Sequence, residues 1–153
     1  MTVPHHCSVL VLCLITACGS PDYGAPSDAT MINLSQGGGF GGPQVSRSVR
    51  ITGTAATYMF GAATSQETID SVAVADIIAA LQDIGFLDLQ AEYTTCTPEI
   101  SDAETVMIYA KVAAGSHTLR HYLGCMGGVF DSLSELDRTI YERSGFNAWL
   151  AGR

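Results

Sequence analysis

The chain has 153 residues, of which 47% are apolar, so its size and composition suit one globular domain with a hydrophobic core. Fifteen Asp and Glu against seven Lys and Arg give a formal net charge of -8, which argues against binding to nucleic acid, because phosphate recognition needs a basic surface. No apolar run reaches the roughly 20 residues that a membrane-spanning helix requires.

The first thirty residues indicate export from the cytoplasm. Residues 8–17 form an apolar stretch of ten residues, which is too short to span a bilayer but typical of the apolar part of a secretory signal peptide. Residues 19–29 contain two prolines, two glycines and two aspartates, a composition typical of a flexible linker. The alternative is that residues 8–18 form a buried segment of the domain, but their amino-terminal position favours export.

The apolar stretch ends in Ala17, Cys18 and Gly19, and this ending resembles the lipobox of bacterial lipoproteins. In that family the signal peptidase cleaves before the cysteine, and the new amino-terminal thiol carries a diacylglycerol. The resemblance implies that Ala17 is the last residue removed and that Cys18 is the lipidation site, in a protein that also carries an acyl chain such as palmitate. It implies a membrane-anchored protein of the cell envelope that faces the periplasm or the exterior. Gly19 in place of aspartate favours the outer membrane, where the producer has one.

The expected organisation therefore has three parts. Residues 1–17 form a lipoprotein signal peptide, residues 18–29 form the lipidated cysteine and a flexible tether, and residues 30–153 form a single domain. The domain shows no break in composition and no internal repeat.

The first half of the domain predicts a loop, a hairpin and a helix. Residues 36–42 contain five glycines, which predicts a flexible loop that carries Phe40. Residues 45–52 alternate between apolar and polar side chains and predict a strand, with residues 56–60 as its hairpin partner. Residues 71–84 have apolar side chains at spacings of three and four and predict a helix capped by Asp70 or Ser71, which Gly85 ends.

The second half predicts another hairpin and another helix. Residues 105–112 and 117–123 alternate as strands around a turn that contains Gly115. Ser132 and Glu135 have the spacing of a capping box, so the second helix is expected over residues 133–143, ended by Gly145. The order of these elements predicts an α+β fold, with a mostly antiparallel sheet of four to five strands and two helices packed on one face.

Two cysteines are left after export. Cys7 and Cys13 are lost with the signal peptide and Cys18 is acylated, which leaves Cys96 and Cys125. In an oxidising compartment two cysteines most often pair, so we expect a disulfide between them. The alternative is two separate buried thiols.

No catalytic signature is found at a diagnostic spacing, so the chain is expected not to be an enzyme, and neither a cofactor nor a metal site is expected. His117 and His121 are four residues apart, which on a strand separates them by about 13 Å, too far to share one metal ion. Glu99, Asp102 and Glu104 suggest a solvated acidic loop rather than a calcium site, because they lack the glycine-spaced calcium-loop pattern.

From Gly85 onward the chain resembles a family of small exported bacterial domains of unknown function. The resemblance rests on scattered residues: Gly85, Phe86, Leu89, Tyr93, Asp102, Tyr122, Gly124, Trp149 and Leu150. It implies the order of strands and helices given above, and members are often lipoproteins. Many members carry a Cys-Phe-Gly-x-Cys-Pro segment, of which residues 39–43 here lack both cysteines, so Cys96 and Cys125 are expected to replace that link.

A local resemblance connects the glycine-rich loop with protease inhibitors. Ile32 and Leu34, followed by Gly38, Gly39, Phe40, Gly41 and Gly42, are similar to the opening of emfourin-like inhibitors of thermolysin-type metalloproteases. The resemblance implies a binding loop whose Phe40 enters the active-site cleft of a protease. The alternative, which we favour from the composition, is that the glycines form a turn and Phe40 packs into the core.

Two functions follow as expectations. The first is a membrane-anchored envelope lipoprotein whose small non-enzymatic domain binds a partner, either another envelope component or a protease. The second is a proteinaceous inhibitor of thermolysin-like metalloproteases. An enzyme with an unrecognised site is a third class, because residues that meet only in space are invisible in one sequence.

Overall fold

The computed structural model describes residues 21–38, 46–97 and 102–153. Cys18, Gly39, Phe40, Gly41, Gly42 and Glu99 lie outside these ranges. The described elements in chain order are β1 (Met31–Gly37), β2 (Arg47–Thr52), β3 (Ala55–Phe60), β4 (Ala63–Thr68), α1 (Ser71–Asp83), the short 3-10 helix η1 (Phe86–Asp88), β5 (Glu92–Tyr93), β6 (Thr105–Val112), β7 (Gly115–Tyr122), α2 (Val129–Arg143) and α3 (Phe146–Ala151).

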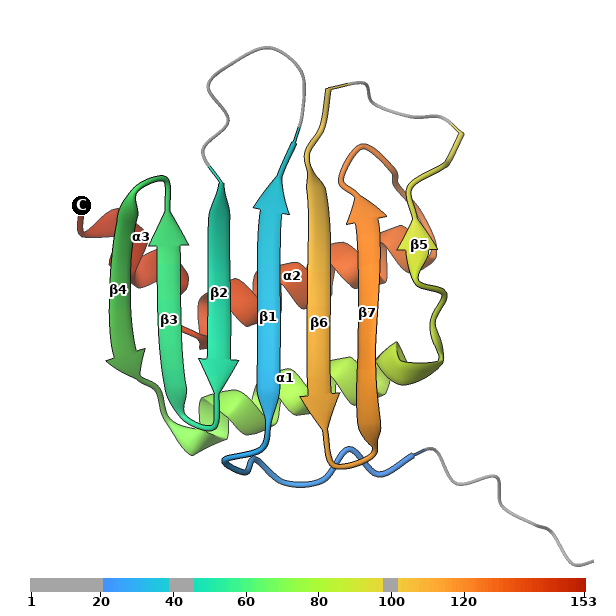
Figure 1. Cartoon of the computed structure of the whole chain (residues 1–153). Coiled ribbons are helices and arrows are strands. Elements are labelled where there is room, and N and C mark those ends of the chain that lie inside the picture. The colour runs from blue at the N-terminus through green and yellow to red at the C-terminus, as the bar shows by residue number, and fades with distance from the viewer. Residues whose placement is uncertain (1–20, 39–45, 98–101) are drawn as a thin grey trace, which may run out of the picture.

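The strands form one seven-stranded sheet in the order β4-β3-β2-β1-β6-β7-β5 (Figure 1). Every neighbouring pair is antiparallel except β5 and β7, which run parallel. The α+β class is therefore confirmed, with a mostly antiparallel sheet. The expected size was wrong, because the sheet has seven strands rather than four to five and three α-helices accompany it rather than two.

α1 and α2 cross the same face of the sheet, and α3 follows at the edge near β4 (Figure 1). Alternate residues of the central strands point to these helices, as the alternation predicts. Ile32 of β1 lies between Ile51 of β2 and Ala110 of β6 in the register. The helices bury Val74, Ile77, Ile78, Leu81, Leu133, Leu136, Ile140 and Tyr141 against this face. The core thus forms one layer between sheet and helices.

The ends of the helices test the capping predictions. Asp70 caps α1, since its carboxylate accepts a hydrogen bond of 2.8 Å from the amide of Val72, and Gly85 follows in the left-handed region at φ 63°. The second helix starts earlier than expected, at Val129 after Gly128, so Ser132 lies inside it and is not its N-cap. The aromatic contact of Phe130 with Tyr93 packs the added turn against β5, a contact that no local pattern reveals.

The segment before β1 is packed rather than free. Tyr23 is 1% exposed, its hydroxyl accepts a hydrogen bond of 2.9 Å from the amide of Leu87, and its carbonyl accepts one of 3.2 Å from the amide of Ala113. Thr30 is also buried. The chain is therefore packed against the domain at Tyr23 and Thr30, which the linker composition of residues 19–29 did not predict.

Candidate functional site

The face of the sheet opposite the helices is open, since no element among the described residues covers it (Figure 1). The register brings its side chains into rows across the strands. One row runs Met59, Ser48, Ser35, Met107 and Arg120, from β3 to β7. The neighbouring row runs Thr57, Arg50, Asn33, Tyr109 and Thr118. The open face is therefore polar at its centre, and Met59, Met107 and Tyr109 are the large side chains in these two rows that can make apolar contacts.

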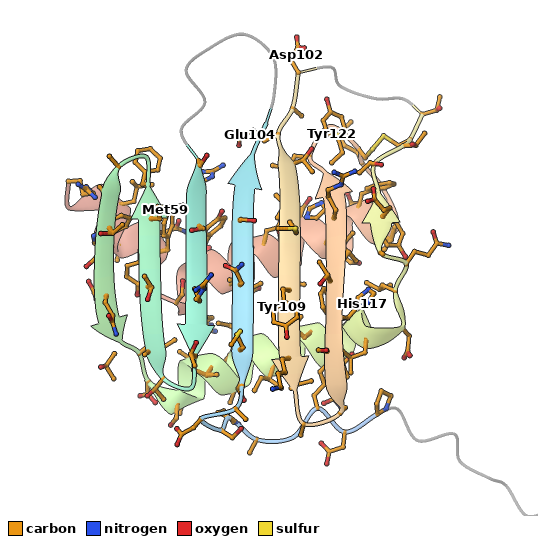
Figure 2. The ribbon with its side chains drawn as sticks, in the orientation of Figure 1. Met59, Asp102, Glu104, Tyr109, His117 and Tyr122 are labelled. Carbon is orange, nitrogen blue, oxygen red and sulfur yellow. A yellow bond between two sulfur atoms is a disulfide. The ribbon has the colours of Figure 1, made fainter. Side chains whose placement is uncertain are left out.

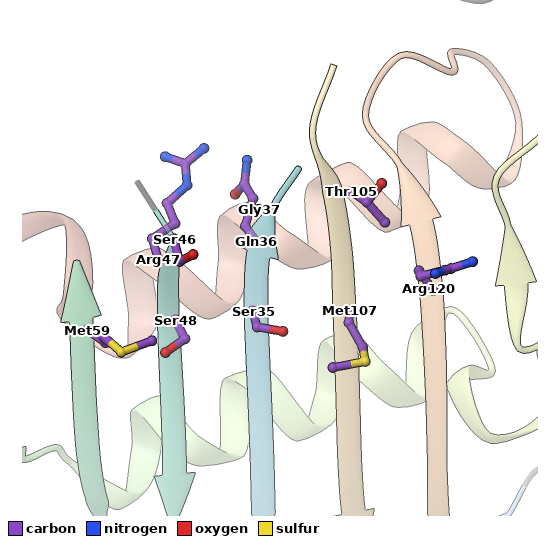
Figure 3. A pocket seen from close by; sticks show the side chains of 10 residues that line it. All are labelled: Ser35, Gln36, Gly37, Ser46, Arg47, Ser48, Met59, Thr105, Met107 and Arg120. Atoms are coloured by element: carbon purple, nitrogen blue, oxygen red, sulfur yellow. The ribbon is translucent and has the colours of Figure 1, made fainter. Parts of the chain in front are cut away.

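A shallow hollow lies over the first row, with a volume of about 450 Å³ (Figure 3). Ser35 and Ser48 lie in its middle because the central strands carry small side chains there, while Met59 and Met107 lie on either side. Met59 and Met107 are 37% and 44% exposed. A smaller hollow of about 240 Å³ continues over Asn33, Arg50, Thr57 and Thr64. The two hollows share Ser48 and Met59, so they form one irregular surface.

On the helix side, a buried polar pair links β7 to α2. His121 Nε2 lies 2.9 Å from Asp137 Oδ2, and the two side chains are 1% and 8% exposed. Burial raises the pKa of Asp137, although the hydrogen bond with His121 and the charge of Arg47 act in the opposite direction. The other polar atoms of the pair, His121 Nδ1 and Asp137 Oδ1, have no hydrogen-bond partner within the described ranges. The pair is thus desolvated and incompletely satisfied.

A second polar group lies beside this pair, towards the end of β1. The Tyr141 hydroxyl donates a hydrogen bond of 3.1 Å to Gln36 Oε1, and the Gln36 amide donates to Glu104. Arg47 lies 3.2 Å from the same carboxylate, and its guanidinium carbon is 5.6 Å from the centre of the Tyr141 ring. Burial raises the pKa of Tyr141 above its usual value. These contacts fix α2 on the sheet, and their buried members do not face solvent.

The predicted site residues are placed as follows. Cys96 and Cys125 form a disulfide with a Cα–Cα distance of 5.7 Å, which joins the segment after β5 to the one before α2. His117 contacts Phe86, with ring centroids 5.4 Å apart, while His121 pairs with Asp137, so the two histidines have separate surroundings. Figure 2 shows His117 low on β7 and Glu104 at the opposite end of the sheet.

The acidic residues do not form a metal centre within the described part of the chain. Glu104 is engaged by Gln36 and Arg47, and Asp102 is exposed, with a φ of 69°. In residues 21–38, 46–97 and 102–153, no group of three or more His, Cys, Asp and Glu side chains is arranged to hold a metal ion. Of the expected binding loop, only Gly38 is described, at a φ of 90° just after β1.

Two features were missed from the sequence. Asp137 lies four residues after Leu133 and three before Ile140, so its place in the apolar stripe of α2 is the signal that it is buried. His121 similarly alternates with Leu119 on the inward face of β7. The open-face hollow had no local signal, because it depends on which strands are neighbours.

Comparison of the sequence with protein-family models and with curated proteins finds no match. Within the described residues, none of the helices has the length and apolar character needed to cross a membrane.

Proposed function

We propose that the chain is a non-enzymatic, lipid-anchored domain of the cell envelope that binds a partner through the open face of its sheet. The observation that carries this proposal is the pair of exposed methionines, Met59 and Met107, on either side of the hollow over Ser35 and Ser48. Isolated apolar side chains on a surface are common, but two that border one hollow offer a partner two apolar contacts in one place. Methionine, arginine and aromatic residues are also enriched in protein interfaces.

The anchor is proposed at Cys18, from the resemblance of its surroundings to a lipobox. Cys18 precedes the buried Tyr23 by five residues, which span at most about 18 Å when extended. An acyl group on Cys18 then keeps the domain close to the lipid, on the side where Tyr23 contacts the β6–β7 turn. The Cys96–Cys125 disulfide is compatible with an oxidising compartment outside the cytoplasm, and Gly19 favours the outer membrane.

The proposal of a non-enzymatic role draws on the surroundings of His121 and Asp137. A His–Asp pair can serve a catalytic nucleophile, but catalysis requires the histidine to reach a substrate. Side chains that are 1% and 8% exposed are shielded from an external substrate. Their position between β7 and α2 supports a structural role.

Cross-linking in native membranes tests the binding function. A photoreactive amino acid placed at Met107 should form adducts with a partner, whereas the same group at Ser134, exposed on α2, should not. Equal adduct formation at both positions, or none at Met107, contradicts binding through the open face.

The anchor is tested separately with Cys18→Ser. An alkyne-tagged palmitate should label the original chain and not the variant, and the variant should leave the membrane fraction. Equal labelling of both chains contradicts acylation of Cys18.

The second candidate is inhibition of thermolysin-like metalloproteases through the loop around Phe40. Its support is the resemblance described above, together with the position of Ile32 and Leu34 in the core of the central strand β1, which leads into the loop through Gly38. At micromolar concentration the soluble chain should slow proteolysis by thermolysin. Phe40→Ala should weaken this inhibition at least tenfold. Unchanged proteolysis at that concentration contradicts inhibition of this class.

A further inference from the structure

The basic side chains of this acidic protein differ in whether they pair with an acidic residue. Arg47, Arg120, Arg138 and Arg143 each form an ion pair with an acidic residue, and Arg153 lies over the ring of Trp149. Arg50 and Lys111 are exposed and have no ion pair within the described residues. Both lie on the open face of the sheet. The chain has a net charge of -8, yet Arg50 and Lys111, which have neither an ion pair nor a ring contact within the described residues, lie on the same face.

The register places three cations around one aromatic ring. Asn33 of β1 lies between Tyr109 of β6 and Arg50 of β2 in one row across the sheet. The Cα atoms of Tyr109 and Arg50 are therefore two strand spacings apart, or about 10 Å. Lys111 is two residues along β6, or about 7 Å away. Arg120 is diagonal to Tyr109 on β7, at about 8 Å, and pairs with Glu92 at 3.0 Å. Figure 2 shows Tyr109 on β6, on the side towards the viewer.

This group, which we call the Tyr109 patch, consists of Tyr109, Arg50, Lys111 and Arg120. Tyr109 is partly exposed, and Met107, two residues before it on β6, borders the hollow. A tyrosine supplies a large contact area at a small cost in conformational entropy, and arginine binds carboxylates in a bidentate geometry. The patch therefore combines an apolar anchor with cations that suit carboxylate groups.

The charge around the patch selects among anionic partners. The patch extends only about 10 Å from Tyr109, which is close to the Debye length at physiological ionic strength. The chain as a whole carries a net charge of -8. A long, uniformly charged polyanion that extends past the patch is repelled by this net charge. A protein segment with a few carboxylates between uncharged residues meets the cations alone.

We propose that the Tyr109 patch binds an acidic segment of a protein partner, with Tyr109 as the apolar contact and Arg50, Lys111 and Arg120 as partners for its carboxylates. This inference rests on the proposed binding function of the open face and adds the chemistry of the partner. In the free protein Arg120 pairs with Glu92. In the complex a carboxylate of the partner either replaces Glu92 or binds Arg120 beside it.

The probe is a synthetic peptide of about ten residues, in which three glutamates are separated by alanine and serine, added to the isotope-labelled chain from residue 18 with Cys18→Ser at low salt. Amide resonances should shift on β1, β2, β6 and β7 around Tyr109. The double variant Arg50→Gln with Lys111→Gln should bind about fivefold more weakly, as expected for two exposed ionic contacts. The matched control, Arg138→Gln with Arg143→Gln on α2, changes the net charge equally and should bind as the original chain. Tyr109→Ser should also weaken binding, and thermal unfolding of each variant verifies its fold.

Three results overturn the inference: shifts centred on the helix side, equal weakening by both double variants, or heparin binding the patch more tightly than the glutamate peptide. The cross-linking experiment at Met107 separates this inference from the proposed function. Adducts at Met107 without binding of the glutamate peptide reject the acidic partner and retain a binding face. An absence of adducts at Met107 rejects the binding face itself, and the inference with it.

Discussion

Asp137→Ala is expected to destabilise the domain by about 3 kcal/mol. The estimate follows from burial, because the side chains of His121 and Asp137 are only 1% and 8% exposed. Removing one partner of a buried pair costs about 3–5 kcal/mol. A pair on the surface contributes only about 0–1 kcal/mol. The lower end applies because each side chain has a polar atom without a described partner, so the pair is incompletely satisfied.

The assay is urea unfolding monitored by the fluorescence of Trp149, the single tryptophan, which packs against Tyr58 and Phe146. The control is the double variant His121→Leu with Asp137→Leu, which removes both polar groups together. We expect it to be at least as stable as the original chain, because well-packed apolar side chains can replace a buried polar pair. A loss below about 0.5 kcal/mol for Asp137→Ala, or a double variant less stable than the single one, refutes this reasoning.

The same pair gives a dependence on pH. Burial raises the pKa of Asp137 in the folded chain, so the folded state holds this proton more tightly than the unfolded one. Its contribution to stability is complete below the usual aspartate pKa of about 3.9 and is lost as the pH rises through the raised value. The advantage of the original chain over Asp137→Asn should therefore be larger near pH 4 than at pH 7.5, measured by urea unfolding at both values. The opposite order contradicts desolvation as the dominant cause.

Three further substitutions test the packing. Cys125→Ser should lower the free energy of unfolding by about 3–4 kcal/mol, because it opens a loop with a sequence separation of 29, and dithiothreitol should affect the original chain but not the variant. Gly24→Ala should cost at least about 1 kcal/mol in urea unfolding, since its φ is 73° and a Cβ there would lie 2.7 Å from the Cβ of Ala113; an unchanged midpoint contradicts the packing of this segment. Tyr58→Phe should lower stability by about 1–2 kcal/mol in the same assay, because the Tyr58 hydroxyl donates to the buried carbonyl of Ser144, and a neutral effect means that this carbonyl finds another donor.

Sequence reasoning succeeded where one side of an element is apolar. The helix over Ser71–Asp83 and the hairpin of Thr105–Val112 with Gly115–Tyr122 have clear periodicity, and the structure agrees with them within one or two residues. β4 was missed because it is an edge strand with polar residues on both sides, so its strand conformation comes from pairing with β3. β5 was missed because two residues are too few to show a period.

The candidate site was less predictable, because its parts come from distant positions. Arg50 and Tyr109 are in different hairpins, and only the placement of β1 between β2 and β6 brings them into one row. Tyr23 lay in a stretch with the composition of a linker, and its burial depends on Leu87 and Ala113, far along the chain. Local composition describes the neighbours in sequence and does not reveal these contacts in space.

The attachment of Tyr23 also determines how mechanical force enters the domain. Any pull on the chain ahead of Tyr23 is resisted first by its buried ring and its hydrogen bonds to Leu87 and Ala113, and passes next into β1. β1 is central and is bonded on both sides, to β2 and to β6. A load along this strand is shared by many hydrogen bonds in shear instead of opening them one at a time, so pulling β1 out of the sheet from its amino-terminal end should require a high force.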